Sequence, residues 1–236
     1  MRLPPLLLLG DAGVGKSHFC RTLTESLGMS FECVPLAGTS QELHITGLSK
    51  NWGSAGPSRL AEIMAKVPMA NPMVMVDEID KASDIKVHNA LLQIFEPETA
   101  ARWVDQYVEV PIDLSRVMFV ATANDLASLS PLLVSRFEVF EIKKPSDEQL
   151  VAVLNSIYFD ELRQFGHPGI FHSDLPAEVC SQLIQSAMTP REARRVLLNA
   201  MECAVIRTHR QKGSLRRGRV TVQLEDLPRA LASDQE

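Results

Sequence analysis

The stretch "GDAGVGKSHF", residues 10–19, matches every fixed position of the phosphate-loop template G-x-x-x-x-G-K-[ST]. Glycines allow the backbone to curl so that its N–H groups face phosphate oxygens, and a following helix presents the positive end of its dipole to the same anion. The alternative is an ordinary strand-to-helix turn, but a lysine beside two glycines has no packing purpose there. We therefore expect the nucleotide phosphates to be bound by Gly10, Asp11, Ala12, Gly13, Val14, Gly15, Lys16, Ser17 and His18.

The residues on either side of this loop provide the context that such a site requires. The apolar run 6–9 before the loop is typical of a buried parallel strand. After the loop, apolar residues recur at a spacing that suits one face of a helix, which Gly28 ends. These residues are Val14, Phe19, Leu23 and Leu27. The loop is thus predicted to join a strand to a helix.

A second apolar strand supplies acidic side chains. "MVMVDEIDK", residues 73–81, ends its apolar run at Asp77 and Glu78. Asp77 and the Ser17 hydroxyl would hold Mg²⁺, while Lys16 would bind the β- and γ-phosphates. Glu78 would point the other way and act as the general base for water. Alone, the segment would be an acidic turn exposed to solvent; after a phosphate loop, we favour the catalytic interpretation.

A third apolar strand, "FVATAND" at residues 119–125, ends in Asn124. The Asn124 side chain could form hydrogen bonds with both the γ-phosphate and the attacking water. An ordinary asparagine in a turn after a strand explains the same pattern equally well. From this segment alone, both interpretations stay open.

The order of the predicted elements indicates an α/β fold. Short apolar strands are predicted at 32–35, 73–76, 117–121 and 137–142, and 107–110 alternates in polarity. A helix begins near residue 60, and 85–95 is amphipathic, whereas 38–57 is rich in Gly, Ser and Asn and is expected to be largely loop. Strands that alternate with helices predict a parallel sheet flanked by helices, the arrangement of a P-loop NTPase.

The pattern becomes helical after residues 144–146. Helices are predicted at 149–162, 176–187 and 190–206, followed by a basic loop at 213–218 and a small strand at 220–222. We therefore divide the chain into an α/β nucleotide-binding domain, residues 1–145, and a small, mostly α-helical lid domain, residues 146–236.

Composition restricts the class of protein. The 236 residues can form one large domain or two modest ones, and 45% hydrophobic with 22% charged residues is typical of a soluble globular protein. The net charge of −5 provides no overall electrostatic case for nucleic-acid binding. The four cysteines are scattered without a C-x-x-C pair, so we expect reduced thiols in a cytoplasmic protein. The leading apolar run is too short for a signal peptide, and no later stretch is long enough to span a membrane.

With the phosphate loop, Asp77, Glu78, Asn124 and a helical second domain in place, the sequence resembles an AAA+ ATPase. It is most similar to the ATPase module of Lon proteases, from about residue 7 to about residue 227. The similar segments follow one another in Lon order: "NPMVMVDEIDK" (71–81), "NALLQIFEPE" (89–98), "YVEVPIDLSRVMFVATAN" (107–124) and "LLVSRFEVFEI" (132–142). Several of them lie outside the general nucleotide motifs, which makes the resemblance specific.

The resemblance implies two arginine roles. Arg136 matches the arginine finger, which acts on ATP held by a neighbouring subunit; a surface salt bridge is the alternative. Arg191 matches the second sensor on the lid, which touches the γ-phosphate in its own subunit. Lon has Gly-Val-Arg at that point and this chain has Thr-Pro-Arg, so Arg194 and Arg195 are nearby alternatives.

The resemblance also implies a substrate channel. Trp52 lies where Lon has its pore-loop aromatic residue, and Trp103 lies near the second pore loop. Such side chains would grip an unfolded polypeptide. The alternative for Trp52 is a partly buried anchor of its loop. Lon has a bulky apolar residue and then Gly after the aromatic residue, whereas Gly53 and Ser54 follow here, which puts the strength of the grip in question.

The resemblance therefore leads us to expect an ATP- and Mg²⁺-dependent ATPase that forms a homo-oligomeric ring, taken as hexameric, and remodels or unfolds protein. The chain has no room for Lon's proteolytic domain, so we expect no peptidase activity, and we expect the adenine contact that usually precedes the first strand to be missing or supplied otherwise. A nucleotide-controlled switch with slow turnover is the alternative. A third class, nucleic-acid remodelling, has support only from a basic stretch that a solvated loop explains better. Its residues are Arg207, Arg210, Lys212, Arg216, Arg217 and Arg219.

Overall fold

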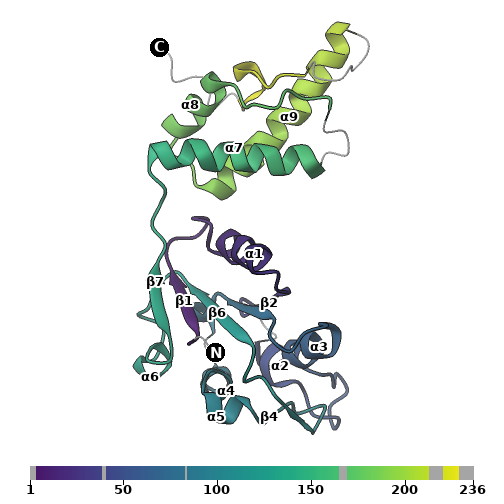
Figure 1. Cartoon of the computed structure of the whole chain (residues 1–236), viewed down its shortest axis with the longest axis vertical. Coiled ribbons are helices and arrows are strands. Elements are labelled where there is room, and N and C mark those ends of the chain that lie inside the picture. Colours follow the sequence, from purple (N-terminus) through teal and green to yellow (C-terminus); the bar gives the residue numbers. More distant parts are fainter. Residues whose placement is uncertain (1–3, 39–40, 83, 165–168, 213–219, 229–236) are drawn as a thin grey trace. The chain divides into compact units, whose positions relative to one another are not determined.

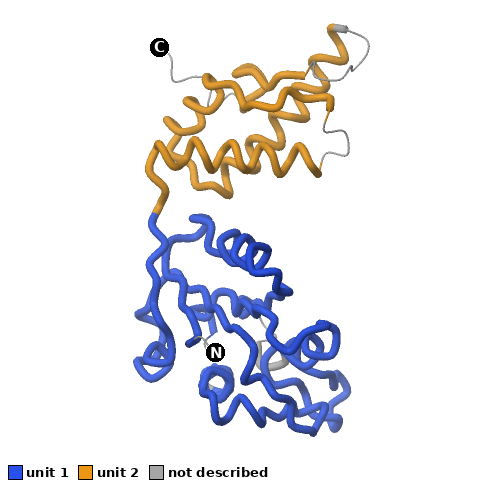
Figure 2. The backbone as a smooth tube through the Cα atoms, viewed as in Figure 1, with its two compact units in different colours: residues 1–143 blue, residues 144–236 orange. Residues whose placement is uncertain are grey.

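The computed structural model describes residues 4–38, 41–82, 84–164, 169–212 and 220–228. These residues form two compact units, 1–143 and 144–236, which are described separately below (Figure 2). The basic residues Arg216, Arg217 and Arg219 and the predicted loop at 213–218 lie outside the described residues.

The first unit is built around a five-stranded parallel sheet in the order β2-β3-β6-β1-β7 (Figure 1). The sequence predicts such a sheet, and the structure confirms it. The strands are β1 (Leu6–Leu9), β2 (Phe31–Pro35), β3 (Met73–Asp77), β6 (Met118–Ala123) and β7 (Glu138–Glu141). A separate antiparallel pair consists of β4 (Trp103–Val104) and β5 (Pro111–Ile112).

Helices cover both faces of this sheet. They are α1 (Lys16–Leu27), α2 (Gln41–Thr46), α3 (Arg59–Lys66), α4 (Ile85–Phe95), α5 (Pro97–Ala100) and α6 (Pro131–Val134), with a 3₁₀ turn, η1 (Ile79–Lys81), after β3. Parallel strands that are buried on both faces are apolar throughout, which explains the continuous apolar runs at 6–9 and 73–76.

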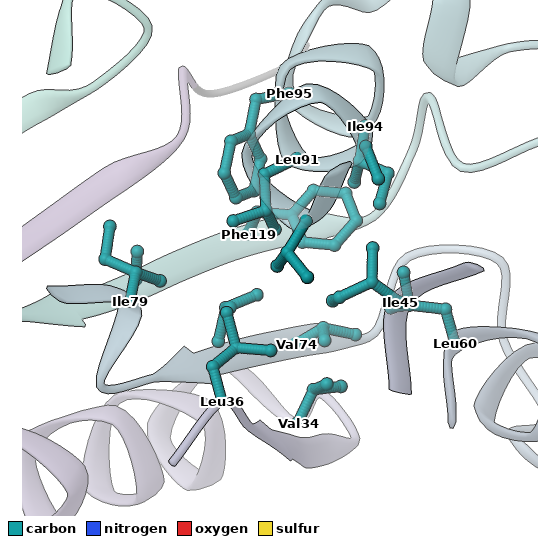
Figure 3. Packing of buried hydrophobic residues seen from close by; sticks show 14 of the residues in the cluster. Val34, Leu36, Ile45, Leu60, Val74, Ile79, Leu91, Ile94, Phe95 and Phe119 are labelled. Atoms are coloured by element: carbon teal, nitrogen blue, oxygen red, sulfur yellow. The ribbon is translucent and has the colours of Figure 1, made fainter. Parts of the chain in front are cut away.

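Successive side chains of each strand point to opposite faces, so two cores form. On one face, Val74 and Phe119 pack with Leu91 and Phe95 of α4 and with residues of α2 and α3 (Figure 3). The rings of Phe95 and Phe119 meet edge to face at 5.5 Å. On the other face, a smaller core forms around Cys20 of α1. Its other buried members are Leu8, Met73, Met75 and Val120.

The buried face of α1 differs from the prediction. Phe19 and Leu27 are 44% and 53% exposed, whereas Cys20 and Thr24 are almost completely buried. The buried residues of the helix thus follow the i, i+4 series from Lys16 through Cys20 to Thr24. The phosphate loop fixes where the helix starts and turns Lys16 inward, and this rotation decides which side of the helix meets the sheet.

One further prediction needs correction, because the strand expected at 220–222 reduces to a single bridge between Val220 and Phe171. The described part of 38–57 is largely loop, as expected, with α2 inside it. Residues 107–110, whose polarity alternates, form a turn, with Glu109 in the left-handed region (φ 61°).

The second unit is helical, as the sequence predicts. It contains α7 (Asp147–Gln164), α8 (Ala177–Gln185), α9 (Pro190–Lys212) and the 3₁₀ turn η2 (Leu224–Asp226). The core between the helices includes Leu154 and Tyr158 of α7 and Leu197 of α9, all with no exposed surface. The Tyr158 hydroxyl donates to the carbonyl of His172, so this buried phenol is satisfied.

Candidate nucleotide-binding site

The phosphate loop depends on glycine at three positions, for two different reasons. Gly13 and Gly15 have φ angles of 82° and 108°, which side chains with a Cβ rarely adopt. At Gly10, a Cβ would lie 2.3 Å from the carbonyl oxygen of Ile142, which forbids any larger residue. The loop therefore leaves β1 and enters α1 along a path that only glycine permits.

Helix α1 begins directly at Lys16, and its N-cap, Gly15, provides no side-chain hydrogen bond. The first N–H groups of a helix have no partner within the helix, so a phosphate at this position would find amide donors and the positive end of the dipole. The residues that the sequence assigned to phosphate binding, 10–18, thus form one continuous turn into a helix N-terminus.

Lys16 lies inward and is only 9% exposed. Its Nζ donates to the carbonyl oxygens of Gly10 and Asp11, at 2.5 and 3.0 Å, and to Asn124 Oδ1 at 3.0 Å. Burial lowers the pKa of Lys16, whereas the nearby charges of Asp77, Asp80, Glu78 and Asp11 raise it. The phosphate-loop lysine, Asn124 and the acidic end of β3 therefore share one electrostatic environment.

The strand register explains why these groups meet. β3, β6 and β1 are neighbours in the centre of the sheet, and Gly10, Asp77 and Asn124 lie at or just beyond their carboxyl ends. Val76 pairs with Ala121, and Leu9 pairs with Ala123. Ligands of open α/β sheets bind outside these strand ends.

A buried threonine joins the two acidic residues that the sequence singled out. The Thr122 hydroxyl donates to Asp77 Oδ1 at 2.6 Å and accepts from the Glu78 N–H at 2.9 Å. Glu78 itself has a left-handed backbone (φ 57°, ψ 51°), which turns the chain from β3 into η1. This conformation is uncommon for a residue other than glycine and often marks functional sites.

Asn124 is held in a similar way by Asp80. Oδ2 of Asp80 accepts from the backbone N–H of Asn124 at 3.2 Å and from its Nδ2 at 3.4 Å. The Asn124 carboxamide is therefore oriented with Oδ1 toward Lys16 and Nδ2 toward Asp80. Oδ1 of Asp80 is buried and has no hydrogen-bond partner among the described residues.

The residues around the loop suit a magnesium–nucleotide complex. Ser17 is half-buried in the first turn of α1, and Asp77 is half-buried at the end of β3. Hydroxyl and carboxylate oxygens are the hard ligands that Mg²⁺ prefers, usually with substrate phosphates and water completing its shell. Asp77 has lone pairs beyond the one that accepts from Thr122.

Arg136, the candidate arginine finger, follows α6 and is 39% exposed. Its Nη1 lies 2.8 Å from Glu96 Oε2, so a glutamate at the end of α4 holds the guanidinium within the same chain. The surface salt bridge considered as the alternative is thus present. An exposed pair contributes little to stability, and a role in a neighbouring subunit's site remains compatible with it.

The candidate arginines of the second unit differ in the contacts that they make. Arg191 is exposed on the first turn of α9. Nε of Arg194 lies 2.6 Å from Oε1 of Glu161, a buried carboxylate on α7, so Arg194 joins two helices of the second unit. Arg207, from the basic stretch, binds Asp226 and the carbonyl of Thr221. The contact of Arg194 with Glu161 leaves Arg191 and Arg195 as candidates for the second sensor. The contacts of Arg207 within the second unit weaken the case that the basic stretch binds nucleic acid.

The two candidate pore residues have opposite environments. Trp52 is 69% exposed at the tip of a hairpin that closes through the bridge between Leu48 and Gly56. Trp103 is only 4% exposed and belongs to the core against α4. A side chain buried in this core cannot contact a polypeptide, so the expectation for Trp103 is corrected to a packing role.

The base of the Trp52 hairpin is attached to the segment after β4 by Asp105, which has no exposed surface. Asp105 Oδ2 accepts from the Ser58 N–H at 2.7 Å, while Oδ1 accepts from the N–H groups of Tyr107 and Val108. Gly47 is required beside it, because a Cβ there would lie 2.8 Å from Oδ2. Asp105 therefore ties the two loops together.

Asp105→Asn is expected to loosen the hairpin selectively. The amide oxygen can still accept from Tyr107 and Val108, but the amide nitrogen would face the Ser58 N–H, donor against donor. We expect hydrogen exchange at residues 47–58 to accelerate about tenfold or more, since an unsatisfied buried donor costs roughly 1–3 kcal/mol. The control is Asp113→Asn, in an exposed turn. If residues 47–58 exchanged hydrogen at the same rate in the parent and in Asp105→Asn, Asp105 would not be the residue that holds the two loops together.

Two cysteines of the first unit, Cys20 in α1 and Cys33 in β2, have thiols with raised pKa values. Burial raises the pKa of Cys20 to about 12 and that of Cys33 to about 11. Both thiols are therefore protonated at neutral pH, and neither supplies a thiolate nucleophile to the site.

Several residues of this site escaped the sequence analysis. Thr122 and Asp80 lie within motifs that were recognised, "FVATAND" and "DEIDK", but no role was assigned to them. Glu96 and Asp105 are single acidic residues, and nothing in the sequence pattern predicted a role for either of them. Their partners are backbone groups or side chains distant in sequence, and only the folded chain brings these together.

The comparisons with known proteins agree with this geometry. A model of the ATPase family associated with various cellular activities (AAA) matches residues 6–145. Lon protease of Neorickettsia sennetsu is 34% identical over 216 residues, which is 88% of this chain and 26% of that protein. Lon protease of Bacillus thuringiensis is 41% identical over 142 residues, 59% of this chain and 18% of that one. The peroxisomal Lon protease homolog 2 of Eremothecium gossypii is 29% identical over 95% of this chain and 22% of that protein.

The chain belongs to the AAA family of ATPases. Within that family, its AAA region is similar to the corresponding region of Lon proteases, and the chain spans about a fifth to a quarter of their length. Of the helices in the described ranges, none has both the length and the apolar composition to cross a bilayer.

Proposed function

We propose that the chain binds Mg-ATP and hydrolyses it as part of an oligomeric ring that remodels or unfolds protein. The observation that supports this most is the single network at the carboxyl ends of β1, β3 and β6. In that network buried Lys16 binds Asn124, and Thr122 joins Asp77 to Glu78. Family membership supports the ATPase class, and the residue roles below are our assignments.

Nucleotide binding would involve the phosphate loop, Asp77 and Arg191. Backbone N–H groups of residues 10–18 and the Lys16 ammonium would take the phosphates, and Arg191 would reach the γ-phosphate from the lid. Ser17 and Asp77 would hold Mg²⁺, which when bound neutralises developing charge on the phosphate oxygens. Lys16 is already desolvated, so its interaction with a phosphate is stronger than it would be in water.

Hydrolysis would proceed by in-line attack of water on the γ-phosphorus. Glu78 accepts a proton from the water as its oxygen bonds to phosphorus, and the bond from phosphorus to the β–γ bridging oxygen breaks, giving ADP and inorganic phosphate. Asn124 positions the water. Arg136 completes the site of the neighbouring subunit by placing its guanidinium near the γ-phosphate.

The polypeptide contact would be made by Trp52, whose ring is exposed on a hairpin that Asp105 anchors.

Arg136→Ala tests whether neighbouring subunits share an ATPase site. In the parent, the ATPase rate per subunit is expected to rise with protein concentration as subunits assemble. In Arg136→Ala, it is expected to fall about 10- to 100-fold at every concentration, since charge-assisted hydrogen bonds contribute roughly 1.5–3 kcal/mol. Arg116→Ala, at an exposed arginine, is the matched control.

The outcomes separate the candidate functions. A rate that is independent of concentration and unaffected by Arg136→Ala would exclude a site shared between subunits. A near-zero rate with tight ATP binding would favour a nucleotide-controlled switch over a motor.

A further inference from the structure

We propose that the hydroxyl of Thr122 is a positioning group for hydrolysis. Its two hydrogen bonds fix the carboxylate of Asp77, which would bind the metal, and the backbone of Glu78, the general base. The proposal rests on the function proposed above. It assigns a role to a residue that makes no contact with the nucleotide in that scheme and acts through two residues that do.

The first argument is location. Thr122 lies in β6, one residue beyond the pairing of Ala121 with Val76, and therefore beside the end of β3. It has no exposed surface, although it carries a polar group. A buried hydroxyl costs free energy unless it is hydrogen-bonded, so the presence of threonine here rather than valine calls for partners. Asp77 and Glu78 are those partners.

The second argument is direction. The Glu78 N–H can only donate, so the Thr122 oxygen must accept from it and must point its own hydrogen elsewhere. That hydrogen goes to Asp77 Oδ1, which as a carboxylate oxygen can only accept. Both bonds together allow one orientation of the hydroxyl. The distance of 2.6 Å to Asp77 is in the range of charge-assisted O–H···O⁻ bonds.

The third argument is the strained backbone of Glu78. A left-handed conformation at a residue other than glycine is unfavourable and persists only where its surroundings hold it. Here the N–H of Glu78 binds Thr122, and its carbonyl accepts from the Lys81 N–H at 3.0 Å. Without the hydroxyl, the peptide before Glu78 could rotate toward an ordinary conformation, and the glutamate side chain would leave its place.

Thr122→Val and Thr122→Ser form the matched pair of variants. Valine keeps the shape and the strand preference but removes the hydroxyl, whereas serine keeps the hydroxyl. At saturating Mg-ATP, we expect kcat of Thr122→Val to fall about 10- to 100-fold, the usual effect of losing a group that orients metal ligands. The KM and the Kd for ATP should stay within about threefold, and Thr122→Ser should recover most of kcat.

Thr24→Val controls for the loss of any buried threonine hydroxyl in the first unit. Thr24 is 1% exposed, and its hydroxyl donates to the carbonyls of Cys20 and Arg21 within its own helix. We expect its kcat to match that of the parent. If the role of Thr122 were purely structural, Thr122→Val would have a lower melting temperature but would show no selective loss of kcat relative to KM.

A second measurement requires no substitution. Hydrogen exchange at the Glu78 amide of the parent chain should be slow, because the Thr122 oxygen accepts from it. If the Glu78 amide exchanged as fast as an amide of an unstructured peptide, the proposal would be overturned. It is also overturned if kcat is unchanged in Thr122→Val, or if Thr122→Ser is as impaired as Thr122→Val. A parent that does not hydrolyse ATP overturns the proposed function, and this proposal with it.

Discussion

Replacing Glu78 by glutamine is expected to lower the maximal rate of ATP hydrolysis about 1,000-fold, within the range of general-base catalysis. Glutamine has the size of glutamate but cannot accept the proton of the attacking water. Its backbone N–H still reaches Thr122, so the turn into η1 should persist. The measurement is single-turnover hydrolysis alongside equilibrium binding of ATP, and the Kd should change less than about threefold.

The control for this variant is Glu98→Gln. Glu98 is exposed in the first turn of α5, away from the network around Lys16. Its rate should equal that of the parent. If Glu78→Gln hydrolysed ATP as fast as the parent does, the proton would go to another group, and the assignment of the base would be wrong.

Replacing Lys16 by alanine is expected to weaken ATP binding roughly 100- to 10,000-fold. The ammonium would make two charge-assisted bonds to phosphate oxygens, each contributing about 1.5–3 kcal/mol, and each 1.4 kcal/mol changes affinity tenfold. Titration with a fluorescent ATP analogue measures the loss. The matched control is Lys66→Ala, because the Lys66 side chain is 69% exposed and pairs with Glu62 on its own helix.

Lys16 also contributes to the structure of the loop, so the fold of this variant must be checked. Its ammonium binds the Gly10 and Asp11 carbonyls and Asn124. Lys16→Met keeps most of the side-chain volume and should lose affinity to a similar extent. Parental affinity in a folded Lys16→Met chain would contradict the phosphate-loop assignment.

The sequence predicted the fold where a single local rule applies. The apolar runs 6–9 and 73–76 had to be strands buried on both faces, and helix α4 has the bounds 85–95 that its amphipathic pattern predicts. Tertiary contacts decide what local preference leaves open. The sequence did not locate α2 inside the Gly- and Ser-rich segment 38–57, where Ile45 is completely buried in the core.

The candidate site divides in the same way. Lys16, Ser17, Asp77 and Glu78 stand at fixed spacings that chemistry dictates, so a sequence motif reveals them. Their network also needs Thr122 and Asp80, whose roles follow from strand register and from the left-handed turn at Glu78. No spacing along the chain encodes these relations.

The sequence by itself therefore determined the parallel sheet, the helical second unit and the phosphate-loop chemistry, because glycine conformations, apolar periodicity and strand-end acids are local properties. Tertiary structure alone decided that α1 buries Cys20 and Thr24 rather than Phe19 and Leu27, that Trp103 belongs to the core while Trp52 is exposed, and that Glu96 holds Arg136. The physical reason is that burial and hydrogen-bond partners depend on which distant segments the sheet brings together.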